Sequence, residues 1–175
     1  LCEFRFLIES GIPMIKRSQV MGEITRGKVT VAVAGTHGKT SITALIAHML
    51  KQADYPFTAL IGGICNNYLT NFNTNRNEDI MIAEADEYDR SFLWLHPDIA
   101  IISAMDADHL DIYGSAAAMN NSFKEFIGHL KTGGMLIKHS GLQVRAGEGC
   151  GLTTYSADEK ADWFAVNLKI EEGLQ

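Results

Sequence analysis

The sequence predicts an α/β fold of the P-loop type, in which a mostly parallel, twisted sheet is flanked by helices. Three observations carry this prediction. Short apolar runs recur along the chain and alternate with segments of helical periodicity. The first run, VTVAVAG at 29–35, is almost continuously apolar and rich in Val, which is typical of a strand buried on both faces. A glycine turn, GTHGKT, follows that run and leads into a helical pattern.

The remaining elements follow in chain order. Residues 1–28 are expected to form a lead-in segment, in which Ser18 caps a short helix that ends near Arg26. After the strand at 29–35, apolar residues at 42, 45, 46, 49 and 50 have the spacing of one helical face. Three further apolar runs bounded by turn residues predict strands at 57–63, 79–85 and 98–104.

The last third of the chain gives a weaker pattern. A helix is predicted from Ser115, with an apolar face that ends near Leu130, and a strand at 133–139. A glycine-rich loop comes next. Two later runs, 152–156 and 162–170, are interpreted as strands of an antiparallel edge. No internal repeat or linker divides the sequence.

Composition restricts the class of protein. A chain of 175 residues with 46% hydrophobic residues is long enough for one ordinary core. A net charge of −6 argues against a protein that coats nucleic acid or an anionic membrane. No apolar run is long enough to span a membrane. The cysteines Cys2, Cys65 and Cys150 are far apart, which favours a reducing compartment, the cytoplasm. The start lacks a signal peptide and an initiator Met, which indicates a piece of a longer chain or a shortened form of one.

The turn between the first strand and the first long helix carries the main chemical signal. Such a turn gathers backbone N–H groups at the positive end of a helix, where a phosphate binds. Lys39 adds a mobile positive charge, and the Thr40 hydroxyl can take a Mg²⁺ coordination position. Val33 stands where the common loop pattern has its outer glycine. The alternative is a tight turn with a chance GKT.

Acidic residues follow two of the predicted strands. Glu84 lies at the end of the strand at 79–85, where a Mg²⁺ ligand beside a phosphate loop is expected. A solvated acidic loop is the alternative interpretation, favoured for Asp86 and considered for Glu87. His109 lies among three carboxylates in DADHLD and is either a metal ligand or a hydrogen-bonding residue. Parallel strands share their carboxyl edge, so these segments are expected to converge.

The three motifs GTHGKT, EADEYD and DADHLD together resemble the central ATPase domain of the Mur ligases. The family loop, GT-x-GK-T/S, also lacks the outer glycine. The resemblance runs from about residue 12 to 139 and more faintly to about 170. It implies that residues 29–175 are an incomplete ATP-binding central domain, and that residues 1–28 lead in from a missing N-terminal domain.

The resemblance also implies an activity in peptidoglycan synthesis. ATP would phosphorylate the carboxylate of UDP-N-acetylmuramate, and the amine of L-alanine would attack the acyl phosphate. Lys39 would neutralise the transferring group, Thr40 and Glu84 would hold one Mg²⁺, and His109 would help to hold a second. Asp89 and Ser91 would face the sugar substrate. The residues implied to cradle the nucleotide phosphates are Gly35, Thr36, His37, Gly38, Lys39, Thr40 and Ser41.

Other interpretations stay open. The branch of the family that attaches a whole tripeptide shares GTHGKT and EADEYD, whereas IPMIKRSQVMGEI and DADHLDIYG favour the branch that adds L-alanine. A nucleotide-binding module without ligase chemistry is a further possibility. Lys124 lies where other Mur ligases carry a modified lysine, but we expect it on an exposed helix face. The chain alone is expected to be inactive, and ATP- and alanine-dependent ligation by it would refute this expectation.

Overall fold

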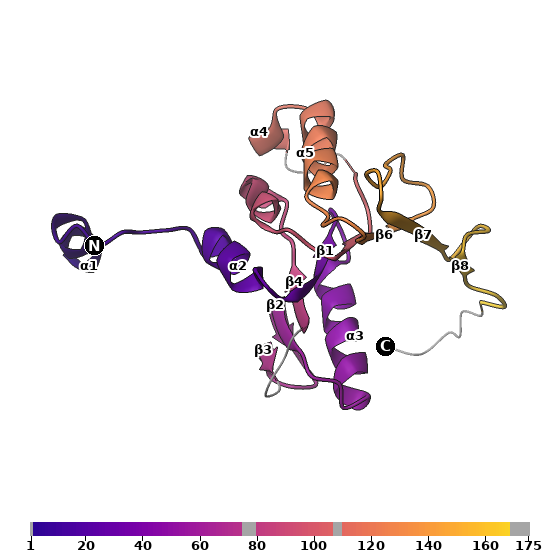
Figure 1. The fold of residues 1–175 in the computed structure, drawn as a ribbon, viewed down its shortest axis with the longest axis horizontal. Helices are drawn as coiled ribbons and strands as arrows, with labels where there is room; N and C mark the ends of the chain where they lie inside the picture. Colours follow the sequence, from indigo (N-terminus) through magenta and orange to yellow (C-terminus); the bar gives the residue numbers. More distant parts are fainter. Residues whose placement is uncertain (1, 75–79, 107–109, 169–175) are drawn as a thin grey trace.

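The structure is a computed structural model that describes residues 2–74, 80–106 and 110–168 (Figure 1). Its helical elements are α1 (Cys2–Glu9), α2 (Arg17–Thr25), α3 (Lys39–Gln52), the 3₁₀ segment η1 (Tyr88–Trp94), α4 (Leu110–Tyr113) and α5 (Ala116–Gly128). Its strands are β1 (Val29–Ala34), β2 (Thr58–Cys65), β3 (Thr70–Thr74), β4 (Ile80–Glu84), β5 (Ile99–Ile102), β6 (Met135–His139), β7 (Gly151–Ser156) and β8 (Trp163–Phe164).

The strands form one sheet in the order β3-β2-β4-β1-β5-β6-β7-β8. Each pairing is parallel except β2 with β3, so the predicted fold class is confirmed. β1 lies in the middle, between β4 and β5, with Val33 opposite Glu84 and Ala34 opposite Ile102. Gly35 and the residues that follow Glu84 and Ile102 therefore leave the sheet at the same edge.

Helices cover both faces of the sheet (Figure 1). On one face, Ala47 of α3 packs with Phe57, Ile61 and Ile82. On the other face, the aromatic rings of η1 and α5 form the core: Phe92 stacks on Phe126 at 4.9 Å between centroids and meets Phe123 edge-on. The buried apolar strands of the sequence are therefore the middle layer of three.

The lead-in segment divides into two parts. α1 lies apart from the sheet on an extended stretch of chain, whereas α2 packs beside η1 (Figure 1). A Cβ on Gly22 would lie 2.6 Å from the Trp94 carbonyl oxygen, so this contact requires glycine on α2. An ion pair of 3.0 Å joins Lys16 Nζ to Asp89 Oδ2 at the start of the helix. The predicted short helix is therefore present, but its N-cap is Lys16, so the cap expected at Ser18 is wrong and Ser18 lies within the first turn.

The sheet edges differ from the prediction. The later strands β7 and β8 are parallel to their neighbours, so the antiparallel edge expected there is wrong. The antiparallel edge is β3, in the stretch TNFNT, whose mostly polar residues gave no strand pattern. Residues 79, 169 and 170 of the predicted strands lie outside the described residues. Among the described helices, none has the length and apolar character to span a membrane.

Candidate nucleotide site and adjoining cavity

The loop at residues 35–40, here called the glycine loop, joins β1 to α3. Gly35 has φ +134° and Gly38 has φ +80°, backbone conformations that L side chains rarely adopt. A Cβ on Gly35 would collide with the Ser103 hydroxyl and lie 2.9 Å from the Ala104 nitrogen. α3 begins at Lys39 with no side-chain cap on its first turn. The N–H groups of that turn are thus presented to a ligand rather than to the protein's own side chains.

Residues that follow β5 hold the glycine loop through hydrogen bonds. The Thr36 N–H donates to the Ala104 carbonyl at 3.0 Å, and the Asp106 N–H donates to the Thr36 hydroxyl at 3.2 Å. The Ser103 hydroxyl donates to the His37 carbonyl. Thr36 is therefore buried and structural. His37 is exposed, and its Nε2 lies 3.6 Å from Asp106 Oδ2.

Lys39 is held by a buried carboxylate. Its Nζ donates to Gly35 O at 2.8 Å and to Glu87 Oε1 at 2.9 Å, and lies 2.8 Å from Glu87 Oε2. The Glu87 side chain is fully buried, so its interpretation as part of a solvated loop is wrong. Burial and the nearby Glu87 charge raise the pKa of Tyr113, whose hydroxyl donates to the Glu87 carbonyl at 2.5 Å. Lys39 is anchored here, not mobile.

Glu84 lies beside the first turn of α3. The Thr40 hydroxyl donates to Glu84 Oε1 at 3.1 Å, and the Gly62 N–H donates to Glu84 Oε2 at 2.8 Å. A Cβ on Gly62 would lie 2.6 Å from the Glu84 carboxyl carbon, so the absence of a side chain at 62 makes room for this carboxylate. The structure thus brings together two residues that are 44 positions apart in the sequence.

The glycine loop and Glu84 border a concavity of about 340 Å³. A hydroxyl and a carboxylate in contact are hard oxygen donors, the kind that Mg²⁺ prefers. Uncapped helix N–H groups and Lys39 supply the positive charge that phosphates require. The residues present therefore fit a magnesium-bound nucleotide. The concavity is lined by Thr36, His37, Gly38, Lys39, Thr40, Ser41 and Glu84.

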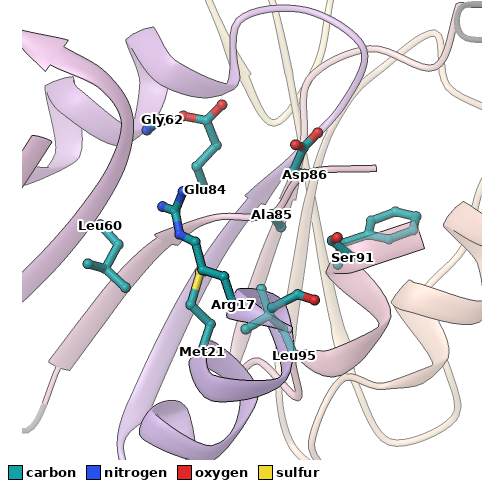
Figure 2. Close-up of a pocket in the computed structure, with 11 residues that line it drawn as sticks. Arg17, Met21, Leu60, Gly62, Glu84, Ala85, Asp86, Ser91 and Leu95 are labelled. Atoms are coloured by element: carbon teal, nitrogen blue, oxygen red, sulfur yellow. Dashed lines mark hydrogen bonds between the residues drawn. The ribbon is translucent and has the colours of Figure 1, made fainter. Parts of the chain in front are cut away.

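A second cavity, of about 270 Å³, also has Glu84 in its lining (Figure 2). Ser91 lines this cavity, whereas Asp89 does not and instead pairs with Lys16; their expected place facing the sugar substrate stays a prediction. Asp89 and Arg90 have φ of +57° and +58°, a strained conformation for residues with side chains. The lining residues are Arg17, Ser18, Met21, Leu60, Gly62, Glu84, Ala85, Asp86, Ser91, Phe92 and Leu95.

Two residues of this region were missed by the sequence reasoning. For Glu87 a solvated loop was the alternative considered, and Arg17 belonged to the lead-in segment without a role of its own. No local pattern marks either residue, because Glu87 pairs with a lysine 48 positions away and Arg17 lines a cavity together with Glu84 of β4 only in the folded chain.

Two other predictions from the sequence concern His109 and Lys124. His109 lies outside the described residues, so its predicted metal role stays a prediction. Lys124 lies on α5 with an exposed side chain, as expected. Within the described part of the chain, no cluster of three or more potential ligands among His, Cys, Asp and Glu has metal-binding geometry.

Comparison with known proteins decides the family. Residues 33–175 match the Mur ligase middle domain. The chain belongs to the Mur ligase family. The sequence is 42% identical over 173 residues to a UDP-N-acetylmuramate–L-alanine ligase of Parabacteroides distasonis, and 42% identical over 174 residues to one of Porphyromonas gingivalis. These matches cover 98% of this chain but only 37% and 38% of the relatives, so the chain spans little more than a third of their length.

Solved structures of Mur ligases share this fold. The UDP-N-acetylmuramate-alanine ligase of Thermotoga maritima has a TM-score of 0.73 and 25% identity, with 90% of this chain and 36% of that chain covered. The UDP-N-acetylmuramate:L-alanyl-gamma-D-glutamyl-meso-diaminopimelate ligase of Neisseria meningitides has a TM-score of 0.75 and 24% identity, with 87% and 53% covered. The family resemblance inferred from the three motifs is thereby confirmed.

Proposed function

We propose that this chain is the ATP-binding part of a ligase that joins L-alanine to UDP-N-acetylmuramate in peptidoglycan synthesis. One structural observation carries the proposal: Thr40 and Glu84 are in contact, at 3.1 Å, beside the uncapped start of α3. The names of the relatives that are 42% identical support the choice of substrates. Residues 29–175 form the nucleotide-binding domain, residues 1–28 connect it to a preceding domain, and the protein works in the cytoplasm.

Each residue of the site has a defined task in this proposal. The Thr36 N–H already donates to Ala104, so the other residues of the glycine loop and Ser41 supply the backbone N–H groups around the nucleotide phosphates. The Lys39 ammonium stabilises the negative charge of the transferring phosphoryl group, and Glu87 holds this ammonium in position. Thr40 and Glu84 hold Mg²⁺, with His109 assigned to a second ion. Magnesium, when bound, withdraws charge from the phosphate oxygens.

The reaction has two balanced steps. In the first, a carboxylate oxygen of UDP-N-acetylmuramate attacks the γ-phosphorus of ATP, so that an acyl phosphate forms and ADP leaves. In the second, the L-alanine amine attacks the acyl carbon, loses a proton, and displaces inorganic phosphate, leaving an amide. The second cavity, lined by Ser91, is the place for the acid substrate. The acid and the γ-phosphate then meet beside Glu84, where in-line transfer requires the attacking carboxylate oxygen to lie opposite the leaving oxygen of ADP.

The tripeptide-adding branch is the weaker alternative. The Neisseria meningitides structure has 24% identity, a level at which the likeness concerns the fold alone. The relatives at 42% identity carry the name of the alanine ligase. Nothing in the described site favours a tripeptide over an amino acid.

The test uses a complete ligase. Residues 1–175 replace the matching stretch of the Parabacteroides distasonis relative, and phosphate release is measured with UDP-N-acetylmuramate, ATP and either L-alanine or the tripeptide. We expect release with L-alanine and a loss of about 100-fold or more in kcat for Glu84→Gln, because an amide cannot accept from both Thr40 and Gly62. Glu23→Gln, a surface change on α2, is the matched control.

Other outcomes decide between the alternatives. Turnover with the tripeptide but not with L-alanine would assign the chain to the other branch. A nucleotide-binding module predicts ATP binding that survives Glu84→Ala and His109→Ala, with no release of phosphate that depends on the acid. Nucleotide affinity unchanged by Lys39→Ala would contradict any function for the glycine loop.

A further inference from the structure

The cavity beside Glu84 is partly built by residues that precede the matched family domain. That match begins at residue 33, yet Arg17, Ser18 and Met21 of α2 line the cavity together with β2, β4 and η1. Figure 2 shows the Arg17 side chain running past Met21 with its guanidinium directed toward Glu84 and Gly62. The helix of the lead-in segment thus supplies one wall and a positive charge.

The charged residues around this cavity leave the Arg17 guanidinium available to bind an anionic ligand. The other charged lining residues are Glu84 and Asp86. Both Glu84 oxygens already accept hydrogen bonds, from Thr40 and from Gly62. Within the described residues, the Arg17 guanidinium makes no hydrogen bond or ion pair. Its N–H groups form a planar fork that matches a carboxylate or a phosphoryl group in two parallel hydrogen bonds.

The position of Arg17 is fixed on both sides. Before it, Lys16 pairs with Asp89, and the Lys16 N–H donates to Gln19 Oε1 at 2.8 Å. After it, Gly22 lies against the Trp94 carbonyl. These contacts fix the backbone of Arg17, so the base of its exposed side chain keeps its place at the cavity when a ligand binds.

We propose that Arg17 binds the carboxylate of the acid substrate, the group that accepts the phosphoryl group, and holds it beside Glu84. This inference rests on the proposed function, and it adds a positioning cation from outside the matched family domain. Without the arginine, a carboxylate in this cavity would face Glu84 and Asp86, whose like charges would repel it. Arg17 offsets that repulsion and orients the attacking oxygen.

The test measures KM for UDP-N-acetylmuramate and for ATP separately in the chimeric ligase described above. For Arg17→Gln we expect KM for the acid to rise about 10- to 100-fold, the loss of hydrogen bonds to a charged group, while KM for ATP stays unchanged. Arg17→Lys keeps the charge but lacks the planar fork of N–H groups, so its KM for the acid should lie between those of the parent and Arg17→Gln. Arg26→Gln removes an exposed cation from the other end of α2 and is the matched control.

A competitive inhibitor separates the carboxylate from the diphosphate of the same substrate. UDP-N-acetylglucosamine has the diphosphate but lacks the lactyl carboxylate, so its inhibition constant should be unchanged by Arg17→Gln. An equal loss for both compounds would overturn the proposal in favour of diphosphate binding. An unchanged KM for the acid in an active chimera would overturn it outright, whereas an inactive parent chimera would overturn the proposed function itself.

Discussion

Two parts of the molecule meet at Glu84, and they are built in different ways. The glycine loop takes its shape from its own backbone, through glycines at positive φ and the start of α3. The opposite wall, formed by α2 and η1, depends on contacts between distant residues, such as the pair of Lys16 and Asp89, 73 positions apart. The difference teaches that a phosphate site can be local in sequence while the adjoining substrate wall exists only in the folded chain.

Removing Lys39 should have the largest effect, because it damages the glycine loop in two ways. Lys39→Ala deletes the charge for the phosphates and leaves Glu87, which is fully buried, without its cation. We expect the Kd for Mg²⁺-ATP to rise more than about 100-fold. The free energy of unfolding should fall by about 3 kcal/mol, the cost of breaking a buried pair from one side. Calorimetric binding and urea unfolding measure the two effects.

A double variant separates these two losses. Lys39→Ala with Glu87→Gln removes both charges, so stability should largely return while nucleotide affinity stays low. If affinity returned with stability, the role of Lys39 would be structural.

Gly62→Ala should weaken nucleotide binding at the glycine loop without destabilising the fold. The added Cβ would meet the Glu84 carboxyl group, which is the flexible end of a side chain and can move away. Losing the Gly62 and Thr40 contacts should lower Mg²⁺-dependent nucleotide affinity by about 10- to 100-fold, as for other residues that orient a ligand. The unfolding midpoint should stay close to the parent value. An additive loss in the double variant with Glu84→Ala would contradict this explanation, because the effect acts through Glu84.

Gly22→Ala tests the opposite wall. Its Cβ would approach the Trp94 carbonyl oxygen to 2.6 Å, so α2 must shift away from η1. We expect a loss of about 1–3 kcal/mol in unfolding free energy, typical of overpacking, with nucleotide affinity unchanged. Gly128→Ala on α5 is the matched helical control, because open space surrounds that position and alanine is the better helix former. A gain in stability for both variants would show that α2 is not tightly packed against η1 at Gly22.

The ion pair of Lys16 and Asp89 should have the smallest effect. Both side chains are about half exposed or more, so the pair is screened by solvent. Lys16→Gln should cost about 0.2–1 kcal/mol in unfolding free energy at low salt, and less in 1 M salt. Asp89→Asn should cost the same, since asparagine tolerates the left-handed backbone of this position. If the two losses added in the double variant, the residues would not act as a pair.

The sequence predicted those features that depend on neighbouring residues. The buried strand before Gly35, the helix after Gly38 and the placement of Glu84 at a strand end all follow from local patterns, and each is present. What could not be predicted depends on tertiary contacts. Glu87 has the local surroundings of a surface carboxylate, and its ion pair with Lys39, 48 positions away, is a tertiary contact. The direction of β7 and β8 follows from their neighbours in the sheet rather than from their residues.

The shared position of Glu84 couples the two cavities thermodynamically. Its carboxylate is part of the boundary of both, so a ligand that moves it on one side changes the binding surface on the other. Two such binding equilibria are linked by one coupling free energy, and the factor by which the first ligand alters the second affinity must equal the reverse factor. A pair of ligands that both leave Glu84 where Gly62 and Thr40 hold it would therefore bind without hindering each other, and a ligand that displaces Glu84 would weaken its neighbour by the factor by which that neighbour weakens it.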